Sequence, residues 1–357
     1  MNAQGKRQSN VELLRIMAMI GVIVLHYIAE PGEILANVTI GGGGGKIYGI
    51  ALINSICVCA VDLFIFISGY FMWKANVISI KKPVQLLTEV IIFQEITSLI
   101  SVFSRQTSIK SCVGALLPKN YFVTLYVALY LICPLVNKLI MDLSEDQYRT
   151  WIAVLVLIFS VEPAAVDILE GLLGRSVMGI STIGVLGAQW GYTIVTFLLV
   201  YIIAAYYGKY HIQWSMRKSL LVFFCTVSFL TIWKILELKV GRSIGAEHYQ
   251  NPMVILAAIA VFMIFHNLKL ESQVINRMSK GCFTVFLVHW SFVQILPVSN
   301  PNQMSMLNLM LTLICNTVIV FIISDCIGMC YSFIENMIFD FIGEKIGYYK
   351  LDIKASR

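Results

Sequence analysis

The chain is organised around the stretch Val11–Glu30, VELLRIMAMIGVIVLHYIAE, because it places a cation and an imidazole within an otherwise apolar helix. Arg15 and His26 are eleven residues apart. At about 100° per residue, this spacing brings both side chains to one side of a helix, about 16 Å apart. A bilayer core is about 30 Å thick, so the stretch is long enough to span it. Ionisable groups within a span face protein or a water-filled cavity, so we expect a functional site here.

The composition is that of an integral membrane protein. Hydrophobic residues make up 58% of the chain, charged residues make up 13%, and the mean hydropathy is +0.81. A soluble domain carries about 25% charged residues. The formal net charge of +6 is explained by cytoplasmic loops beside anionic lipid headgroups, so no nucleic-acid partner is expected. The nine cysteines contain no CxxC pair, so we expect neither a bound metal nor a disulfide framework.

The hydropathy pattern predicts a single all-α domain over residues 1–357, a polytopic integral membrane helix bundle with about ten transmembrane helices. The predicted spans are 10–29, 48–73, 83–104, 121–141, 151–161, 191–208, 219–238, 252–268, 281–298 and 306–330. The fifth is short for a crossing and must borrow from 162–173, which carries three acids. The glycine-dotted segment 162–190 is expected to be re-entrant or interfacial.

The distribution of Lys and Arg predicts the orientation of the chain. With a cytoplasmic N-terminus, seventeen of these residues fall in inside segments and seven in outside loops, Arg15 and Lys234 being intramembrane. Lys and Arg are enriched on the cytoplasmic side of membrane proteins. Both termini are therefore predicted to be cytoplasmic.

Several motifs resemble the membrane-bound acyltransferase-3 family of O-acyltransferases. The first is Arg15-x10-His26 in the first span. The second is VDLFIFISGY at 61–70, in which Asp62 precedes an apolar run that ends in Ser68, Gly69 and Tyr70. Further matches are Tyr126-x3-Tyr130-x3-Pro134-x2-Asn137, Gly191 with Phe197, Tyr201 and Ala205-Tyr206, and Phe286-Leu287-Val288-His289. The resemblance covers nearly the whole chain.

This resemblance implies a multi-pass O-acyltransferase of the cell membrane, expected to be an O-acetyltransferase. Its implied donor is cytoplasmic acyl-CoA, here acetyl-CoA. Its acceptor is a hydroxyl of an extracytoplasmic polysaccharide or lipid-linked saccharide, reached among membrane lipids. The charged donor cannot cross the bilayer, but its pantetheine arm can thread inward from Arg15 towards His26. The alternative is a polysaccharide or lipid-linked glycan exporter or flippase without transferase chemistry, since helix bundles with intramembrane charges also serve translocation.

Two intramembrane residues have both a functional and a structural interpretation. Arg15 either meets the acyl donor, or snorkels to the headgroups or pairs with Glu12 one turn back. His26 is expected to be the general base, or to carry the acyl group transiently, and its structural alternative is a hydrogen-bonded packing residue. Lys234 and Glu237 are three residues apart and are expected to pair with each other.

Asp62 is the better functional candidate of the second motif, either as a partner of Arg15 or as a group that orients His26. On a helix it shares a side with Gly69, while Ser68 points away, which argues against a Ser-His-Asp triad with Ser68. Ser68 is instead expected to bond back to its own helix. Gly69 is expected to admit a neighbouring helix.

Four further residues are candidates for the cavity or its surroundings. Glu30 is predicted either to orient the His26 ring or to be a solvated residue at the helix end. Tyr70 closes the second motif. Glu95 lies deep in the third span and must pair across helices or line the cavity. His289 lies near mid-membrane, where it either packs or takes part directly.

Overall fold

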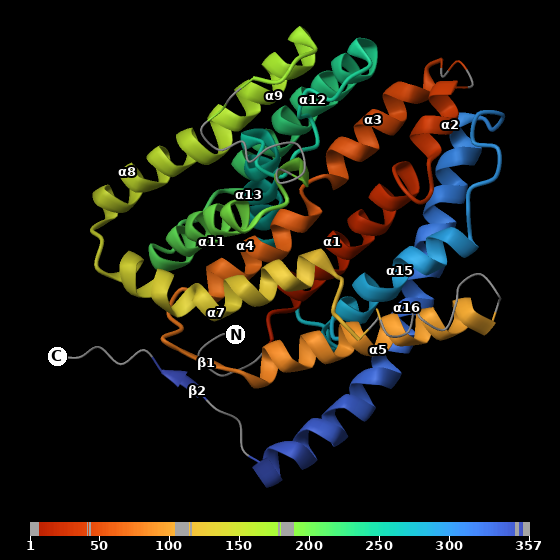
Figure 1. Cartoon of the computed structure of the whole chain (residues 1–357). Helices are drawn as coiled ribbons and strands as arrows, with labels where there is room; N and C mark the ends of the chain where they lie inside the picture. The colour runs from red at the N-terminus through yellow and green to blue at the C-terminus, as the bar shows by residue number, and fades with distance from the viewer. Residues whose placement is uncertain are drawn as a thin grey trace.

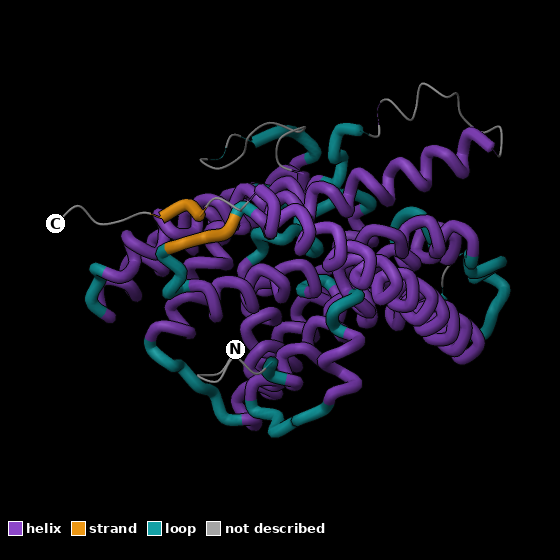
Figure 2. Tube along the Cα trace, turned by 90° about the horizontal axis from the view of Figure 1, so that it is seen from below, coloured by secondary structure: helices purple, strands orange, loops and turns teal. Residues whose placement is uncertain are grey.

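The computed structural model describes residues 7–40, 42, 44–103, 114, 116–177, 179, 189–346 and 350–352. Most of this chain is helical (Figures 1 and 2). The helices are α1 Ser9–Ile28, α2 Ile34–Ile40, α3 Lys46–Cys57, α4 Ala60–Met72, α5 Lys81–Phe103, α7 Tyr121–Met141, α8 Glu145–Val156, α9 Glu162–Leu173, α11 Ile194–Lys209, α12 Met216–Val240, α13 Pro252–His266, α14 Gln273–Met278, α15 Cys282–Ile295 and α16 Met306–Ile346. Two short strands, β1 Val77–Ser79 and β2 Lys350–Asp352, pair antiparallel.

Apolar helices occur where the sequence predicts membrane spans. Seven helical segments of the described chain are long and apolar enough to cross a membrane: Ser9–Ile28, Lys46–Met72, Lys81–Phe103, Tyr121–Met141, Glu145–Leu173, Met216–Val240 and Met306–Glu335. Three shorter apolar helices are α11, α13 and α15. Each predicted span coincides with one of these segments. The protein is a multi-pass membrane protein, while the number of crossings and the orientation of the termini stay predictions.

The fifth predicted span was too short. A π-helical turn, η1 at Leu157–Val161, joins α8 to α9, so that the helix is continuous over Glu145–Leu173. It begins with a capping box between Ser144 and Gln147 and ends at Gly174, whose φ is 65°. The first part of the segment predicted to be re-entrant therefore continues this helix, and most of 177–188 lies outside the described residues.

The second predicted span is broken into two helices. α3 ends at Cys57 and α4 begins at Ala60. α1 passes close to this break, since a Cβ on Gly21 would lie 3.3 Å from that of Ala60. The break places Asp62 in the first turn of α4.

The contact between α4 and α11 forms the centre of the bundle (Figure 1). A side chain on Gly69 would collide with the backbone of Tyr201, which confirms the close approach predicted for this glycine. The Ser68 hydroxyl lies 3.0 Å from the carbonyl oxygen of Phe64, to which it donates. The back-bond predicted for Ser68 is therefore also confirmed. α1 also packs against α4, so the helix that carries Arg15 and His26 belongs to the bundle core.

Candidate functional site

The His26 ring is fixed in the last turn of α1. Its Nδ1 lies 2.8 Å from the carbonyl oxygen of Glu30. A carbonyl oxygen can only accept a hydrogen bond, so Nδ1 carries the proton and the neutral ring keeps its lone pair on Nε2. Glu30 thus orients the ring through its backbone, while the residue itself is exposed. The arrangement leaves Nε2 available as a base.

Two residues of α15 lie against this ring. The His26 ring centroid is 5.0 Å from that of His289 and 4.9 Å from that of Trp290. His289 is buried, its Nδ1 donates to the carbonyl oxygen of Val285 at 3.0 Å, and its Nε2 has no hydrogen-bond partner among the described residues. The predicted His289 therefore lies beside His26. Trp290 was not predicted, although it directly follows the motif that ends in His289.

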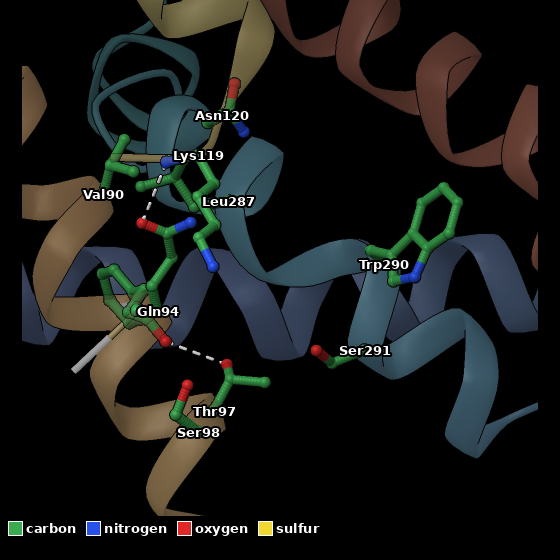
Figure 3. Close-up of a pocket in the computed structure, with 11 residues that line it drawn as sticks. Val90, Gln94, Thr97, Ser98, Lys119, Asn120, Leu287, Trp290 and Ser291 are labelled. Carbon is green, nitrogen blue, oxygen red and sulfur yellow. Dashed lines mark hydrogen bonds between the residues drawn. The ribbon is translucent and has the colours of Figure 1, made fainter. Parts of the chain in front are cut away.

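Trp290 also lines a cavity of about 720 Å³ between α5 and α15 (Figure 3). Its walls are Val90, Phe93, Gln94, Thr97, Ser98, Gly114, Lys119, Asn120, Leu287, Trp290 and Ser291. Amides and hydroxyls thus share the lining with apolar and aromatic groups. The volume falls within the range of small-molecule sites, about 300–1,000 Å³. His26 is not among these lining residues, but its ring contacts Trp290, which is one of them.

The other end of α1 carries Arg15 in an ion pair. One guanidinium nitrogen lies 2.7 Å from Oε1 of Glu12, which confirms the pairing anticipated as the structural alternative. Arg7 approaches Oε2 of Glu12 at 3.8 Å. The Arg15 side chain is 36% exposed, so part of the guanidinium remains accessible to a ligand.

A second cation, Lys82, interacts with the same tyrosine as Arg15. Its Nζ is 5.7 Å from the ring centroid of Tyr126 and 5.1 Å from that of Tyr130. The Tyr126 hydroxyl is 3.0 Å from that of Ser68, and both Lys82 and Arg15 interact with it electrostatically. The matched tyrosines and Ser68 of the second motif therefore come together here. The sequence indicates Lys82 only as a cytoplasmic loop charge, because its position in the first turn of α5 gives no sign of these neighbours.

Asp62 is buried, and its Oδ2 has no hydrogen-bond partner in the described part of the chain. The groups to which Arg15 and His26 bond are Glu12 and the Glu30 carbonyl, so neither predicted pairing with Asp62 is formed. Burial, and then the charge of the Asp62 carboxyl, raise the pKa of the Tyr249 phenol, so Asp62 lies near this residue of the loop between α12 and α13.

The remaining predicted residues lie away from the His26 ring. The Tyr70 hydroxyl is 3.4 Å from Nε2 of His266. Oε1 of Glu95 is buried without a partner among the described residues, and the cavity wall is formed by its neighbour Gln94. The acid of α5 that does bond across helices is Glu89, which accepts from the Thr284 hydroxyl at 2.5 Å.

The predicted pair of Lys234 and Glu237 is confirmed. Lys234 Nζ lies 2.7 Å from Oε1 of Glu237. It also lies 2.6 Å from Oε1 of Glu247, a second acid that the sequence did not indicate. Both contacts lie at the end of α12, where they fix the following loop.

Comparison with known proteins agrees with this arrangement. The sequence profile of the acyltransferase domain of the acyltransferase-3 family matches residues 8–329. No curated protein and no solved structure matches the chain. The matched region runs from the start of α1 into α16 and includes every helix that contributes to the His26 and Arg15 sites. The chain therefore belongs to the acyltransferase-3 family and is a membrane acyltransferase.

Proposed function

We propose that the protein is an O-acetyltransferase of the cell membrane. It transfers an acetyl group from cytoplasmic acetyl-CoA to a hydroxyl of an extracytoplasmic polysaccharide or lipid-linked saccharide. This proposal rests on the geometry of the His26 ring. Its Nδ1 is held by the Glu30 carbonyl, its Nε2 keeps the lone pair, and the ring makes a T-shaped contact with Trp290 of the cavity wall.

The chemistry requires one base and no bound metal. The acceptor hydroxyl gives its proton to Nε2 of His26 while its oxygen attacks the thioester carbonyl. The carbon–sulfur bond breaks, and the imidazolium returns the proton to the leaving thiolate. One ester and one free thiol result. Because the Glu30 carbonyl keeps Nδ1 protonated throughout, the ring presents the same nitrogen in both transfers.

The donor is proposed to bind at the Arg15 end of α1. Arg15 and Lys82 bring two cations to the same tyrosine, Tyr126, and a guanidinium binds phosphate oxygens in a bidentate manner. Arg15 is about 16 Å from His26 along the helix axis. The phosphates therefore stay at the membrane surface, while the uncharged pantetheine arm extends along α1 towards the base.

The acceptor is proposed to occupy the cavity between α5 and α15. Gln94, Thr97 and Ser291 of the lining offer hydrogen-bond partners for sugar hydroxyls, and Val90 and Leu287 offer apolar groups to the carbon skeleton of the sugar. α5 is a poorly buried helix whose Ile100 is 61% exposed, so a saccharide on a lipid carrier has a lateral route to the site. An exporter needs no base at such a wall, and membership of this family favours the transferase.

The test uses the purified full-length protein in lipid nanodiscs. Labelled acetyl-CoA is supplied with an envelope glycan or lipid-linked saccharide fraction, and both free thiol and labelled saccharide ester are measured. We expect both products with the wild type and neither with His26→Gln. Envelope glycan analysis with and without the gene provides the cellular counterpart. Glycan that is exported and acetylated equally in both strains would contradict the transferase, and glycan that is retained inside without the gene would support the exporter.

A further inference from the structure

A hydroxyl, an imidazole and a carboxylate are aligned away from the His26 site, where the loop 241–251 between α12 and α13 meets α9. His248 Nδ1 lies 2.7 Å from Oδ2 of Asp167, and its Nε2 lies 3.4 Å from the Ser243 hydroxyl. An ionised carboxylate only accepts, so Nδ1 carries the proton and the lone pair of Nε2 faces the hydroxyl. A nucleophile, a base and a group that orients the base are thereby arranged in the order used by serine hydrolases.

The loop that carries Ser243 and His248 is held in place by specific bonds. Oε2 of Glu237 accepts from the backbone N–H of Ile244 at 3.0 Å and of Ala246 at 3.2 Å. The indole N–H of Trp233 donates to the Ile244 carbonyl at 3.0 Å. Ile244, Ala246 and Trp233 also form a small apolar cluster with Ala164 of α9. The Ser243 side chain therefore extends from a backbone that is held in one position, as a preorganised nucleophile requires.

Two glycines let this loop approach α9. Gly245 has a φ of 81°, and a Cβ there would come within 2.9 Å of the Asp167 side chain. Gly171 of α9 faces the Ser243 backbone, and a side chain on it would collide with Ile244. Only backbone without side chains at these two points allows Asp167 to reach His248.

Burial within the cluster is graded from the carboxylate to the hydroxyl. The Asp167 and His248 side chains are 16% and 13% exposed, whereas Ser243 lies at the surface. Asp167 also accepts from the side-chain amide of Gln250 at 3.0 Å, which fixes the carboxylate further. The Ser243 hydroxyl has a second possible acceptor, Oε2 of Glu237, at 3.5 Å. That oxygen already accepts the two backbone N–H groups, so His248 Nε2 is the acceptor left for the hydroxyl. The base and its orienting group are thus shielded, while the nucleophile is reachable from solvent.

We propose that Ser243, His248 and Asp167 form a second acyl site, which cleaves carboxylic esters of small acyl groups. Nε2 of His248 takes the hydroxyl proton as Oγ of Ser243 attacks the ester carbonyl. The bond to the alcohol oxygen breaks, and the alcohol leaves with that proton, so that an acyl-serine remains. Water, deprotonated by His248, then attacks the acyl-serine and releases the acid and the free hydroxyl of Ser243.

The predicted topology places this loop on the outer side, where the proposed transferase would deliver its product. The natural substrate class is then an acetyl ester of a saccharide, and the serine would remove acetyl groups that the His26 site adds. This identification of the substrate rests on the proposed function. The reactivity of Ser243 itself does not depend on it.

The test measures that reactivity directly in the full-length protein in nanodiscs. A fluorophosphonate probe phosphonylates an activated serine with loss of fluoride, and mass spectrometry locates the modified peptide. We expect labelling at Ser243, with the rate reduced at least about 10²-fold in His248→Gln, because the base is removed. Ser243→Ala should lose the label. Hydrolysis of p-nitrophenyl acetate should fall in parallel.

Two control variants distinguish an activated Ser243 from nonspecific labelling of exposed serines and from the chemistry of His26. Ser176 is an exposed serine that donates to Oε1 of Glu170 at 3.1 Å, so Ser176→Ala should not change labelling. His26→Gln should abolish acetyl transfer and leave the Ser243 label intact, which distinguishes failure of one site from failure of the other. A folded wild type without label at Ser243, or equal labelling in His248→Gln, would overturn the proposal.

Discussion

The imidazole rings of His26 on α1 and His289 on α15 lie 5.0 Å apart between centroids, and each holds its Nδ1 against a backbone carbonyl four residues away. Both rings therefore keep a lone pair on Nε2. Two positive charges at this separation repel strongly in a poorly solvated site. The pair can thus take up one proton beyond the two on the Nδ1 atoms, and His26, the more exposed ring, is the one that contacts Trp290 of the cavity wall.

Replacing His26 by Gln tests the base. Gln keeps a hydrogen-bonding group but cannot take and carry the proton, so we expect acetyl transfer to fall by about 10²–10⁴-fold at normal expression. Thiol release from acetyl-CoA measures the loss. His211→Asn is the matched control, because His211 lies in an exposed turn with a φ of 51°, which Asn tolerates. A well-expressed His26→Gln protein with wild-type turnover would return His26 to a packing role.

Replacing His289 by Leu tests whether His289 only positions the His26 ring or itself transfers a proton. Leu fills the buried space and removes Nε2, a polar atom for which the described residues offer no partner, so the melting temperature should not fall. Acetyl transfer should drop by about tenfold, since a ring that bounds His26 is lost and small displacements of a catalytic group are costly. A loss as large as that of His26→Gln would instead assign His289 a direct part in proton transfer.

The donor site predicts effects on KM for acetyl-CoA. Arg15→Ala should raise KM more than it lowers kcat, because the side chain is proposed to bind the donor far from the reacting atoms. Arg15→Lys should rescue only partly, since an ammonium lacks the guanidinium fork. Lys82→Met should also raise KM. If both side chains hold one ligand, the loss of binding free energy in the double variant should exceed the sum of the losses in the two single variants. An unchanged KM in Arg15→Ala would mean that Arg15 does not bind the donor and that its role is the ion pair with Glu12.

The topology follows from the charge distribution. Cysteines introduced at Lys81, Lys218 and Arg277 should be protected from an impermeant reagent applied outside, and cysteines at Lys46 and Arg242 should react. Lys46 donates to the carbonyl of Met304 at 3.0 Å, so the loops before α3 and α16 meet on one side. Labelling of Arg277→Cys together with Lys46→Cys from the same side would contradict the ten-span arrangement.

The features that were predicted correctly from the sequence are those that depend on a single helix. Hydropathy located every apolar segment, because burial in lipid acts on each span separately. The back-bond of Ser68 and the pair of Lys234 and Glu237 are contacts within three or four residues, which helical periodicity determines. The break between α3 and α4 was missed, because the residues around Val58 and Cys59 are as apolar as the helices on either side.

The parts of the sites that were missed depend on contacts between distant segments. Trp290 meets His26 across more than 260 positions of sequence, and nothing local distinguishes this tryptophan from those of an interfacial belt. Lys82 could not be recognised as part of a site, because its neighbours there are two tyrosines of α7, a helix far away in the sequence. The alignment of Ser243 and His248 with Asp167 needs α9 to continue past the predicted end of the fifth span.

Asp62 is a buried carboxyl whose Oδ2 lacks a partner in the described structure. A buried carboxyl without a partner costs free energy, most of all when it ionises, so Asp62→Asn, which keeps the shape and cannot ionise, should raise the melting temperature. If the carboxylate serves the reaction, acetyl transfer should fall at least about tenfold in the same protein, as expected where stability is given up for activity. Thermal unfolding followed by tryptophan fluorescence and the thiol-release assay measure the two effects.

The exposed Asp142 at the end of α7 provides the matched control, and Asp142→Asn should change neither quantity. Because Arg15 and His26 bond to other groups, the predicted loss in Asp62→Asn would have to act through the neighbours of Asp62 in the loop between α12 and α13, such as Tyr249. Tyr249→Phe should then reproduce part of the loss. Full activity in Asp62→Asn would show that this carboxyl is a structural residue of the α3–α4 break and has no part in catalysis.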